Sequence, residues 1–575
     1  MGREQANPHT EITRDPAPQH PTFIKTTRQS RHNLTRTLTE KSGLTSIPRH
    51  LEPGIWLDLF ACVGYTVPPR SRAGYRRLHG RSAVALVGRV AAPKRPPDGA
   101  TSDILSTVTT RERSAGKDMA TETTEAVRLP AGPRIPKTVQ GIAFLSTTHG
   151  MFAAMGRRYG SAFTVNLPLF GQGVVISDPI LVKDVFTASS DLIERPTGAG
   201  HLGEAFGPGS TFSLAGNELL ARRKLVVPPF HGKRVRSYEH IIEDEVMREI
   251  ANWPEGREFK TLQPMMRITI NTILRVLFGA EGPAMDELRR LLPPLDALAA
   301  PFALLPPRMR SDLGPWSPGG RFLRLRRRFD NVIDSLIADA RADLALEERS
   351  DVLSLLVQAR YDNGEPIPDR HIADEMLTLV ASGHETTSAG LAWAVERLRR
   401  HPSLLSRLTE EVDAGGSELR QATIWEVLRT RSVLEGTTRR TKKRIRLGDW
   451  VIPENTAVIL SIRMAHASDE SFPDAASFNP DRFVGAGAPK PFAWIPFGGG
   501  VNRCIGSALA NMEMDVTLRT LLRELRFAPT DAPGERRHWR GVATAPGRGG
   551  RAVVYRRTAK VSSDADSVSV ADHAS

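Results

Sequence analysis

A glycine-rich turn followed by one cysteine and a helix constrains this chain more than any other segment. Residues 496–525 read PFGGGVNRCIGSALANMEMDVTLRTLLREL, and the glycines at 498–500 allow backbone conformations that are closed to other residues. Apolar residues then recur at helical spacing, so Cys504 is expected near a helix N-terminus, where free N–H groups and the helix dipole stabilise a thiolate. Such a thiolate fits a haem ligand, a nucleophile or a redox sensor. The Lys-Ser/Thr pair of a phosphate-binding loop is missing.

The cysteine content and the overall composition limit the class of protein. The chain has 575 residues, of which 40% are hydrophobic and 25% charged, an ordinary globular composition with ample material for a large core. Its two cysteines, Cys62 and Cys504, are too few for a disulfide framework or a Cys-rich zinc site. These counts favour a reducing compartment, and we expect a cytoplasmic protein.

Positive charge is concentrated near the N-terminus. The net charge is +14, and residues 1–118 hold 19 Lys and Arg against 10 Asp and Glu. They show little periodicity, so we expect a largely disordered basic extension. Met119 opens the ordered pattern, and both a translation start at Met119 and a genuine basic arm remain open. The remaining chain lacks a basic helix with interleaved aromatic residues, which disfavours nucleic acid as a partner.

No segment has the pattern of a membrane anchor. The most apolar early stretch, residues 51–67, is interrupted by Asp58 and two glycines, and no other long uncharged apolar run occurs. Residues 558–575 are rich in Ser, Asp and Ala and are expected to form a flexible tail.

Between these ends, helical patterns dominate. The stretch 326–348 has apolar residues at helical spacing, and strand-like runs are shorter, at 173–178 and at 450–462 with a turn at 453–455. The segment 377–390, LTLVASGHETTSAG, lies in a long helical pattern, although Gly and Thr are poor helix formers. The sequence therefore predicts a mainly α protein with minor β, in which this mid-helix cluster has a purpose other than packing.

The cysteine segment resembles the haem-binding signature of the cytochrome P-450 family. Phe497, Gly500, Cys504 and Gly506 match its pattern. The resemblance implies haem b with Cys504 as the axial thiolate. One departure is Asn502, which stands where the family has a positive residue that meets a haem propionate, with Arg503 one place later.

Two further segments follow the family order. In TIWEVLRTR, Glu426 and Arg429 share a helix face, and FNPDRF follows some fifty residues later. The resemblance implies that Glu426, Arg429 and Arg482 form the structural Glu-Arg-Arg triad of the family, which is plausible only if all three charges are satisfied. The family often has proline three residues beyond the second member, where this chain has Ser432.

The mid-helix cluster resembles the oxygen-binding helix of the family, in which a local kink makes room for dioxygen. On that resemblance Thr386 hydrogen-bonds oxygen at the iron and Glu385 helps to relay protons. Ser382 replaces the commoner Ala or Gly, and Gly383 is retained.

The propionate contacts are implied less directly. Residues 216–230 resemble the third helix of the family, in which an aromatic residue and a basic residue grip a propionate. Arg223 stands at the basic position and Leu219 at the aromatic one. Arg439 is a second candidate, and a solvated surface role for each arginine stays open.

Taken together, the resemblance covers roughly residues 129–556 and implies the cytochrome P-450 fold of the soluble bacterial type. We expect one large helical domain with a small β-rich lobe, over residues 119–557. The implied function is a monooxygenase that uses dioxygen and an apolar substrate. Its electrons would come from a ferredoxin or flavodoxin with its reductase, since the chain has no Rossmann glycine fingerprint and no cysteines for an iron–sulfur cluster. A peroxide-dependent haem-thiolate enzyme, an impaired or non-catalytic haem binder and a basic interaction protein are the alternatives.

Overall fold

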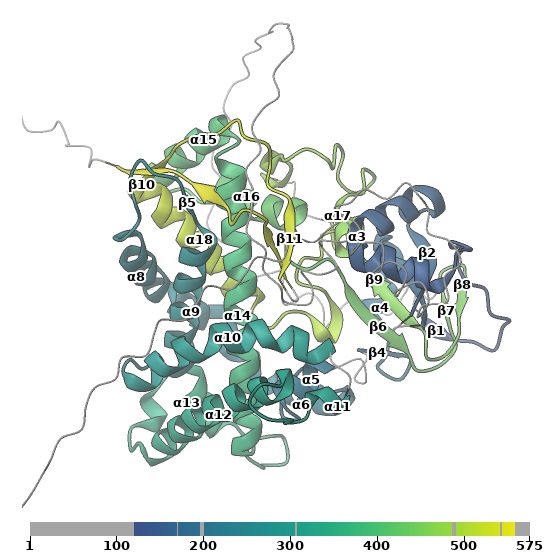
Figure 1. Ribbon diagram of the computed structural model, residues 1–575, viewed down its shortest axis with the longest axis horizontal. Helices are drawn as coiled ribbons and strands as arrows, with labels where there is room; N and C mark the ends of the chain where they lie inside the picture. The colour runs from purple at the N-terminus through teal and green to yellow at the C-terminus, as the bar shows by residue number, and fades with distance from the viewer. Residues whose placement is uncertain are drawn as a thin grey trace, which may run out of the picture. The chain divides into compact units, whose positions relative to one another are not determined.

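The longest helix, α14, carries the predicted mid-helix cluster through the centre of the helical part (Figure 1). The computed structural model describes residues 120–168, 171–195, 201–304, 307–485, 490–540 and 543–557. The predicted N-terminal extension with Met119, the predicted tail and Cys62 lie outside the described residues. The expectations about those segments therefore stay predictions.

Helices make up most of the described chain. The α-helices are α3 (Lys137–Tyr159), α4 (Pro179–Thr187), α5 (His201–Phe206), α6 (Gly216–Val226), α7 (Gly232–Arg236), α8 (Glu239–Ile250), α9 (Leu262–Phe278), α10 (Pro283–Leu304), α11 (Pro307–Arg310), α12 (Pro318–Ala342), α13 (Val352–Gln358), α14 (Asp369–Leu398), α15 (Pro402–Asp413), α16 (Glu418–Thr430), α17 (Ile462–His466) and α18 (Ser507–Glu524). Short 3₁₀ helices are η1 (Pro228–Phe230), η2 (Leu346–Glu348), η3 (Pro480–Phe483) and η4 (Gly500–Asn502).

The strands are short and form small sheets. They are β1 (Thr121–Glu122), β2 (Ala162–Leu167), β3 (Gly171–Ile176), β4 (Ile193–Glu194), β5 (Phe259–Lys260), β6 (Thr437–Thr441), β7 (Ile445–Leu447), β8 (Trp450–Ile452), β9 (Ala457–Leu460), β10 (Leu525–Phe527), β11 (Arg537–Arg540), β12 (Ala543–Pro546), β13 (Arg551–Ala552) and β14 (Val554–Arg556). The largest sheet has the order β2-β3-β9-β6-β4, and together with α3 it lies on one side of the helical part (Figure 1). The predicted mainly helical fold with a small β-rich lobe is confirmed.

Two predicted segments differ in detail. Helix α12 begins at Pro318 rather than Arg326, because the Ser317 hydroxyl accepts from the Gly320 N–H at 2.9 Å and proline is well suited to the first helical position. The run 450–462 turns at Asn455, which has a positive φ of 61°. Its two arms then join different sheets, since β8 pairs with β7 whereas β9 pairs with β3 and β6.

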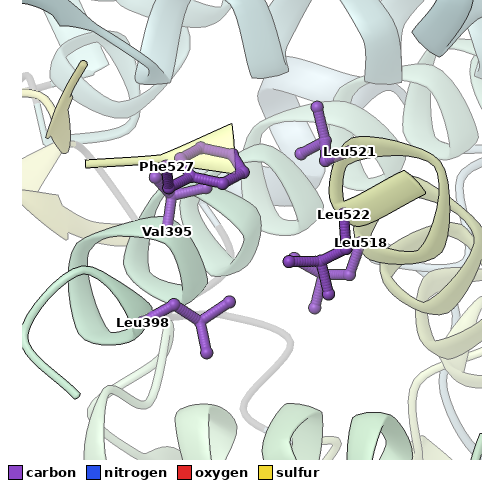
Figure 2. A pocket seen from close by; sticks show the side chains of 6 residues that line it. All are labelled: Val395, Leu398, Leu518, Leu521, Leu522 and Phe527. Carbon is purple, nitrogen blue, oxygen red and sulfur yellow. The ribbon is translucent and has the colours of Figure 1, made fainter. Parts of the chain in front are cut away.

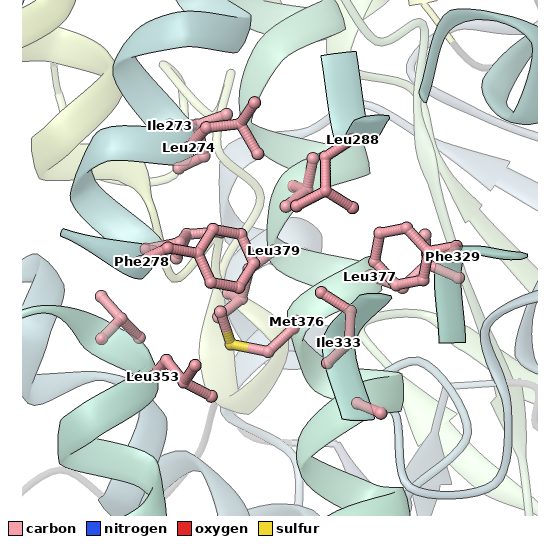
Figure 3. Packing of buried hydrophobic residues seen from close by; sticks show 14 of the residues in the cluster. Ile273, Leu274, Phe278, Leu288, Phe329, Ile333, Leu353, Met376, Leu377 and Leu379 are labelled. Atoms are coloured by element: carbon pink, nitrogen blue, oxygen red, sulfur yellow. The ribbon is translucent and has the colours of Figure 1, made fainter. Parts of the chain in front are cut away.

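The apolar core lies on both sides of α14. On one side, α9, α10, α12 and α13 pack against Met376, Leu377 and Leu379 (Figure 3). On the other, Val395 and Leu398 face α18 and Phe527 of β10 (Figure 2). The leucines of α18 in this second contact begin at Leu518, about four helical turns after Cys504. The core thus holds α14 and α18 against each other and fixes where the Cys504 loop enters the molecule.

Among the residues that the structure describes, no helix combines the length and the apolar character needed to cross a bilayer.

Candidate active site

The Cys504 loop is shaped by its own backbone and by α4. The Cys504 N–H donates to the Phe497 carbonyl at 3.0 Å, and the Arg503 N–H donates to the Gly500 carbonyl at 3.0 Å. Gly500 has φ +64°, and a Cβ atom there would lie 2.1 Å from the carbonyl oxygen of Phe186. Only glycine fits this contact, so Gly500 lets the loop lie directly against α4.

Cys504 precedes α18 by three residues, and the charge state of its thiol depends on opposing effects. Its side chain is exposed, yet burial by the surrounding protein raises the pKa of the thiol, against the Gly506 N–H, Arg223 and Arg503, which lower it. The sulfur is therefore open to solvent on one side and enclosed by protein on the others. The expectation that the helix N-terminus stabilises the thiolate is therefore only partly met, because burial outweighs it. A metal cation on the sulfur would deprotonate it outright.

Arg439 is a buried cation that has no carboxylate among its hydrogen-bond partners in the described residues. It is 4% exposed and donates to Thr437 Oγ1 at 3.0 Å, to the Thr438 carbonyl at 3.0 Å and to the Gly499 carbonyl at 3.4 Å. Burial, and then the charge of Arg195, lowers the pKa of Arg439 to about 10. The position of Arg439 against the Cys504 loop excludes a solvated surface role for it.

Two more arginines lie in the same region. Arg223 of α6 donates to the Arg503 carbonyl at 2.9 Å, and Arg195 donates to the carbonyls of Thr211 and Leu214. Burial lowers the pKa of Arg195, and the neighbouring Arg223 lowers it further. Within the described part of the chain, the hydrogen bonds of Arg195, Arg223 and Arg439 go to carbonyl or hydroxyl oxygens and to no carboxylate. We call these three residues the arginine group.

The donor set around the loop fits an iron porphyrin with two propionates. Cys504 supplies a soft ligand for iron, and the arginine group supplies cations that lack an anion. The buried Oδ1 of Asn502 has no hydrogen-bond partner among the described residues; with its amide turned over, the NH₂ group is a donor for a carboxylate. Leu219 is buried, 4% exposed, and offers no polar atom.

Glu426, Arg429 and Arg482 lie together, as the family resemblance implies. Arg429 binds Glu426 in a bidentate pair, with Nε and Nη2 each 2.7 Å from a carboxylate oxygen, and it also donates to the carbonyls of His466, Ala475 and Ser477. The Nε atom of Arg482 lies 3.3 Å from Glu426 Oε2. Glu426 is fully buried and Arg429 is 2% exposed. We call these three residues the triad; every charge in it is paired.

The predicted oxygen-binding segment lies in an unbroken part of α14. The Thr386 hydroxyl donates to the Ser382 carbonyl at 2.9 Å, a bond that tends to bend helices. Glu385 pairs with Arg540 of β11, whose Nε lies 3.3 Å from Glu385 Oε1. Burial, followed by the charge of Asp296, raises the pKa of Glu385, and Arg540 opposes this. Glu385 therefore keeps its proton to a higher pH than an exposed glutamate does.

Sequence reasoning missed Arg195, Arg540 and His466. Arg195 belongs to none of the recognised motifs, and Arg540 comes from the C-terminal hairpin, 155 residues beyond its partner. His466 belongs to no recognisable motif, and nothing in the sequence around it indicates that it is buried. The one available signal was the position of Arg195 in IERP, between Glu194 and a proline.

Comparison with known proteins agrees with this arrangement. The family model described as Cytochrome P450 matches residues 130–550. "Putative cytochrome P450 138" of Mycobacterium tuberculosis and of Mycobacterium bovis is 50% identical over 432 residues, which cover 75% of this chain and 97% of the relative. "Putative cytochrome P450 135B1" of the same two species is 35% identical over 451 residues, which cover 76% of this chain and 94% of the relative.

Solved structures show the same fold. The structure titled "Retinoic acid bound cyanobacterial CYP120A1" has a TM-score of 0.66 at 21% identity. The match covers 75% of this chain and 100% of that chain. The cytochrome P450DA heme domain has a TM-score of 0.66 at 19% identity, with 76% of this chain covering 99% of it. The chain is a member of the cytochrome P450 family.

Proposed function

We propose that this protein is a haem-thiolate monooxygenase that inserts one atom of dioxygen into an apolar organic substrate and reduces the other atom to water. The observation that carries the proposal is the contact of the Cys504 loop with cations that lack a carboxylate. Arg223 and Arg439 both donate to carbonyls of this loop, and an iron porphyrin with two propionates would satisfy the sulfur and the cations at once.

Each predicted site residue has a place in this proposal. When bound, haem b supplies the activation of dioxygen. Cys504 would hold its iron, and the arginine group would bind its propionates. The residues that give the loop its shape and its charge are Phe497, Gly500, Arg503 and Gly506.

Proton supply is assigned to α14. Glu385 holds a proton more strongly than usual because burial raises its pKa, and Arg540 orients its carboxyl group. The adjacent Thr386 now donates its hydroxyl to the Ser382 carbonyl. A single change of its side-chain rotamer would release this hydroxyl to donate elsewhere. We assign Glu385 as the proton carrier and Thr386 as the donor that delivers the proton.

Electrons are proposed to come from a ferredoxin or a flavodoxin with its reductase. The sequence contains no motif for a second redox cofactor. Arg503 is exposed next to the proposed ligand, and such a cation would attract an acidic carrier protein. This arrangement suits a protein of the bacterial cytoplasm.

The decisive experiment is the absorption spectrum of the full-length protein, reduced with dithionite under carbon monoxide. The proposal predicts a strongly red-shifted Soret band in the wild type and its loss in Cys504→Ser. Retention of haem by the variant, with the spectrum of a neutral ligand, would show that the site is intact and only the thiolate is lost. A wild-type protein without haem, or with a spectrum of histidine ligation, would refute the proposal and favour the impaired haem binder.

A turnover experiment separates the monooxygenase from a peroxide-dependent enzyme. With a ferredoxin and its reductase, we expect substrate oxidation that needs dioxygen and the reductase. Oxidation with hydrogen peroxide that exceeds the reductase-driven rate, and that survives Thr386→Ala, would assign the peroxide-dependent chemistry instead.

A further inference from the structure

His466 lies between the helix that carries the triad and the start of the Cys504 loop. It is the last residue of α17 and is 1% exposed. Its Nδ1 lies 3.0 Å from Ser432 Oγ, just beyond the end of α16. Its Nε2 accepts from the Ile495 N–H at 2.9 Å. One imidazole ring therefore bridges two segments that are 63 residues apart along the chain.

The hydrogen bonds around this ring permit only one arrangement of protons. Ile495 N–H must donate, so Nε2 carries no proton and Nδ1 carries one. The Nδ1–H then donates to Ser432 Oγ, and the Ser432 hydroxyl donates to the Leu428 carbonyl at 3.0 Å or to the Arg429 carbonyl at 3.2 Å. Ser432 thus accepts from the tautomer of His466 that the Ile495 N–H requires.

The same histidine is tied directly to the triad. Its backbone carbonyl accepts from Arg429 Nη1 at 2.7 Å, while its side chain contacts Ser432, three residues after Arg429. The ring stays neutral at physiological pH, because burial and the charges of Arg429 and Arg537 lower the pKa of His466 to about 3. Its bonds are therefore independent of pH in the range in which the protein works.

Short backbone bonds carry the constraint from Ile495 to the cysteine. The Ile495 carbonyl accepts from the Gly498 N–H at 3.0 Å, and the Phe497 carbonyl accepts from the Cys504 N–H at 3.0 Å. Movement of Ile495 would displace the turn that holds the sulfur. We propose that Ser432 and His466 form a positioning pair that anchors the Cys504 loop to the triad helix and keeps the sulfur in place as a ligand.

This inference rests on the proposed function. The positioning pair explains why a serine at position 432 is compatible with that function. Proline or alanine at this position would leave the buried Nδ1–H without an acceptor, which is costly. Threonine would keep the hydroxyl. The pair is a positioning device, and neither residue is expected to touch substrate or haem.

The test uses the holoprotein and follows its carbon monoxide complex in mild urea. We expect Ser432→Ala to convert from the thiolate band to the neutral-thiol band about tenfold faster than the wild type. This rate change corresponds to the free energy typically lost when a buried polar group loses its one hydrogen-bond partner. Ser432→Thr should stay within about twofold of the wild type. The matched control is Thr423→Val on α16, the helix that ends just before Ser432, because Thr423 is fully buried and its hydroxyl bonds, among the described residues, only to the Leu419 carbonyl.

Hydrogen exchange gives a second readout that does not depend on the thiolate. In Ser432→Ala, and in His466→Asn as a second variant, amides of residues 493–504 should exchange faster, while those of α9 should not change. Two results would overturn the positioning pair. One is a conversion rate in Thr423→Val as high as that in Ser432→Ala, and the other is hydrogen exchange that rises equally across the whole protein. If the wild type shows no thiolate band but the exchange pattern holds, the proposed function fails while the pairing stands.

Discussion

The triad and the arginine group contain buried charges of two different kinds. In the triad, the Glu426 carboxylate receives both arginines and the Asn479 N–H at 2.8 Å. In the arginine group, three cations approach one another and, within the described part of the chain, hydrogen-bond only to neutral oxygens, while Glu375 acts on Arg195 and Arg223 through its charge alone. Burying a charge costs several kcal/mol unless a partner compensates it. The comparison teaches that the first set is complete within the chain, whereas the second requires an anion from outside.

The largest expected effect is on the triad. Glu426→Ala removes the one anion that two arginines share, and we expect a loss of about 3–5 kcal/mol in the free energy of unfolding, because Arg429 stays buried without its partner. Urea unfolding followed by far-ultraviolet circular dichroism measures it. A loss below about 1 kcal/mol would show that the backbone carbonyls alone satisfy Arg429, and the contrast between the two sets would disappear.

Glu375 sharpens the comparison because it is a buried acid close to the arginine group. Burial raises its pKa from 4.5 to about 7, against Arg222 and Thr211, which lower it. The folded protein thus keeps the proton that the unfolded chain releases, so stability should fall as pH rises from 4.5 to about 7 and then level off. Relative to Glu375→Gln, we expect the wild type to lose about 3 kcal/mol over this range in urea titrations. Parallel curves for the two proteins would contradict the raised pKa.

A smaller effect is expected from the arginine group. In Arg439→Met, the haem-free protein should be as stable as the wild type or more stable, because an uncompensated buried cation is removed. Haem should be lost about tenfold faster to an excess of apomyoglobin, since one charged partner of a propionate is gone. Arg440→Met on the same strand is the control. A destabilised apoprotein would mean that Arg439 is already paired, as the triad is.

The smallest effect is expected at the surface. Arg407 and Asp481 lie 2.6 Å apart with side chains 50% and 52% exposed. They too form a bidentate pair, with donor–acceptor distances of 3.1 and 2.6 Å. Water screens both charges, so a double-mutant cycle with Arg407→Ala and Asp481→Ala should give about 0.2–1 kcal/mol. A coupling energy as large as that of the triad would show that distance, rather than burial, decides the contribution of an ion pair here.

The parts of this molecule that sequence could predict are those determined over short distances along the chain. Glu426 and Arg429 are three residues apart on a helix, and the glycines that shape the Cys504 loop are its neighbours, so their relation can be seen in the sequence. Arg195 could not be predicted, because its role depends on Arg223 and Arg439, which come from α6 and β6. Nor could His466, since its partners Ser432 and Ile495 meet only after α16, α17 and the loop have packed.

Element boundaries show the same limit. Apolar spacing predicted a helix over 326–348, whereas α12 begins at Pro318, after the Ser317 cap, and ends at Ala342. The turn at 453–455 was found by its residues, but the choice of separate sheets for β8 and β9 depends on strands far away in sequence.

The loop of residues 207–214 has a consequence for the speed of ligand exchange. Thr211 donates its N–H and its hydroxyl to Glu375 of α14, at 2.9 Å each, and its carbonyl accepts from Arg195. Three further bonds hold the same loop: the Gly209 N–H donates to Asp374, the Ser210 and Thr378 hydroxyls bond to each other, and Arg222 donates to the Gly209 carbonyl. At about 1 kcal/mol for each bond, release of all six leaves the loop open in fewer than roughly one molecule in a thousand. Any molecule that enters or leaves beneath this loop would wait for that rare opening. Opening of the loop would then set an upper limit on the rate at which such a ligand leaves, in addition to the limit set by the ligand's own contacts.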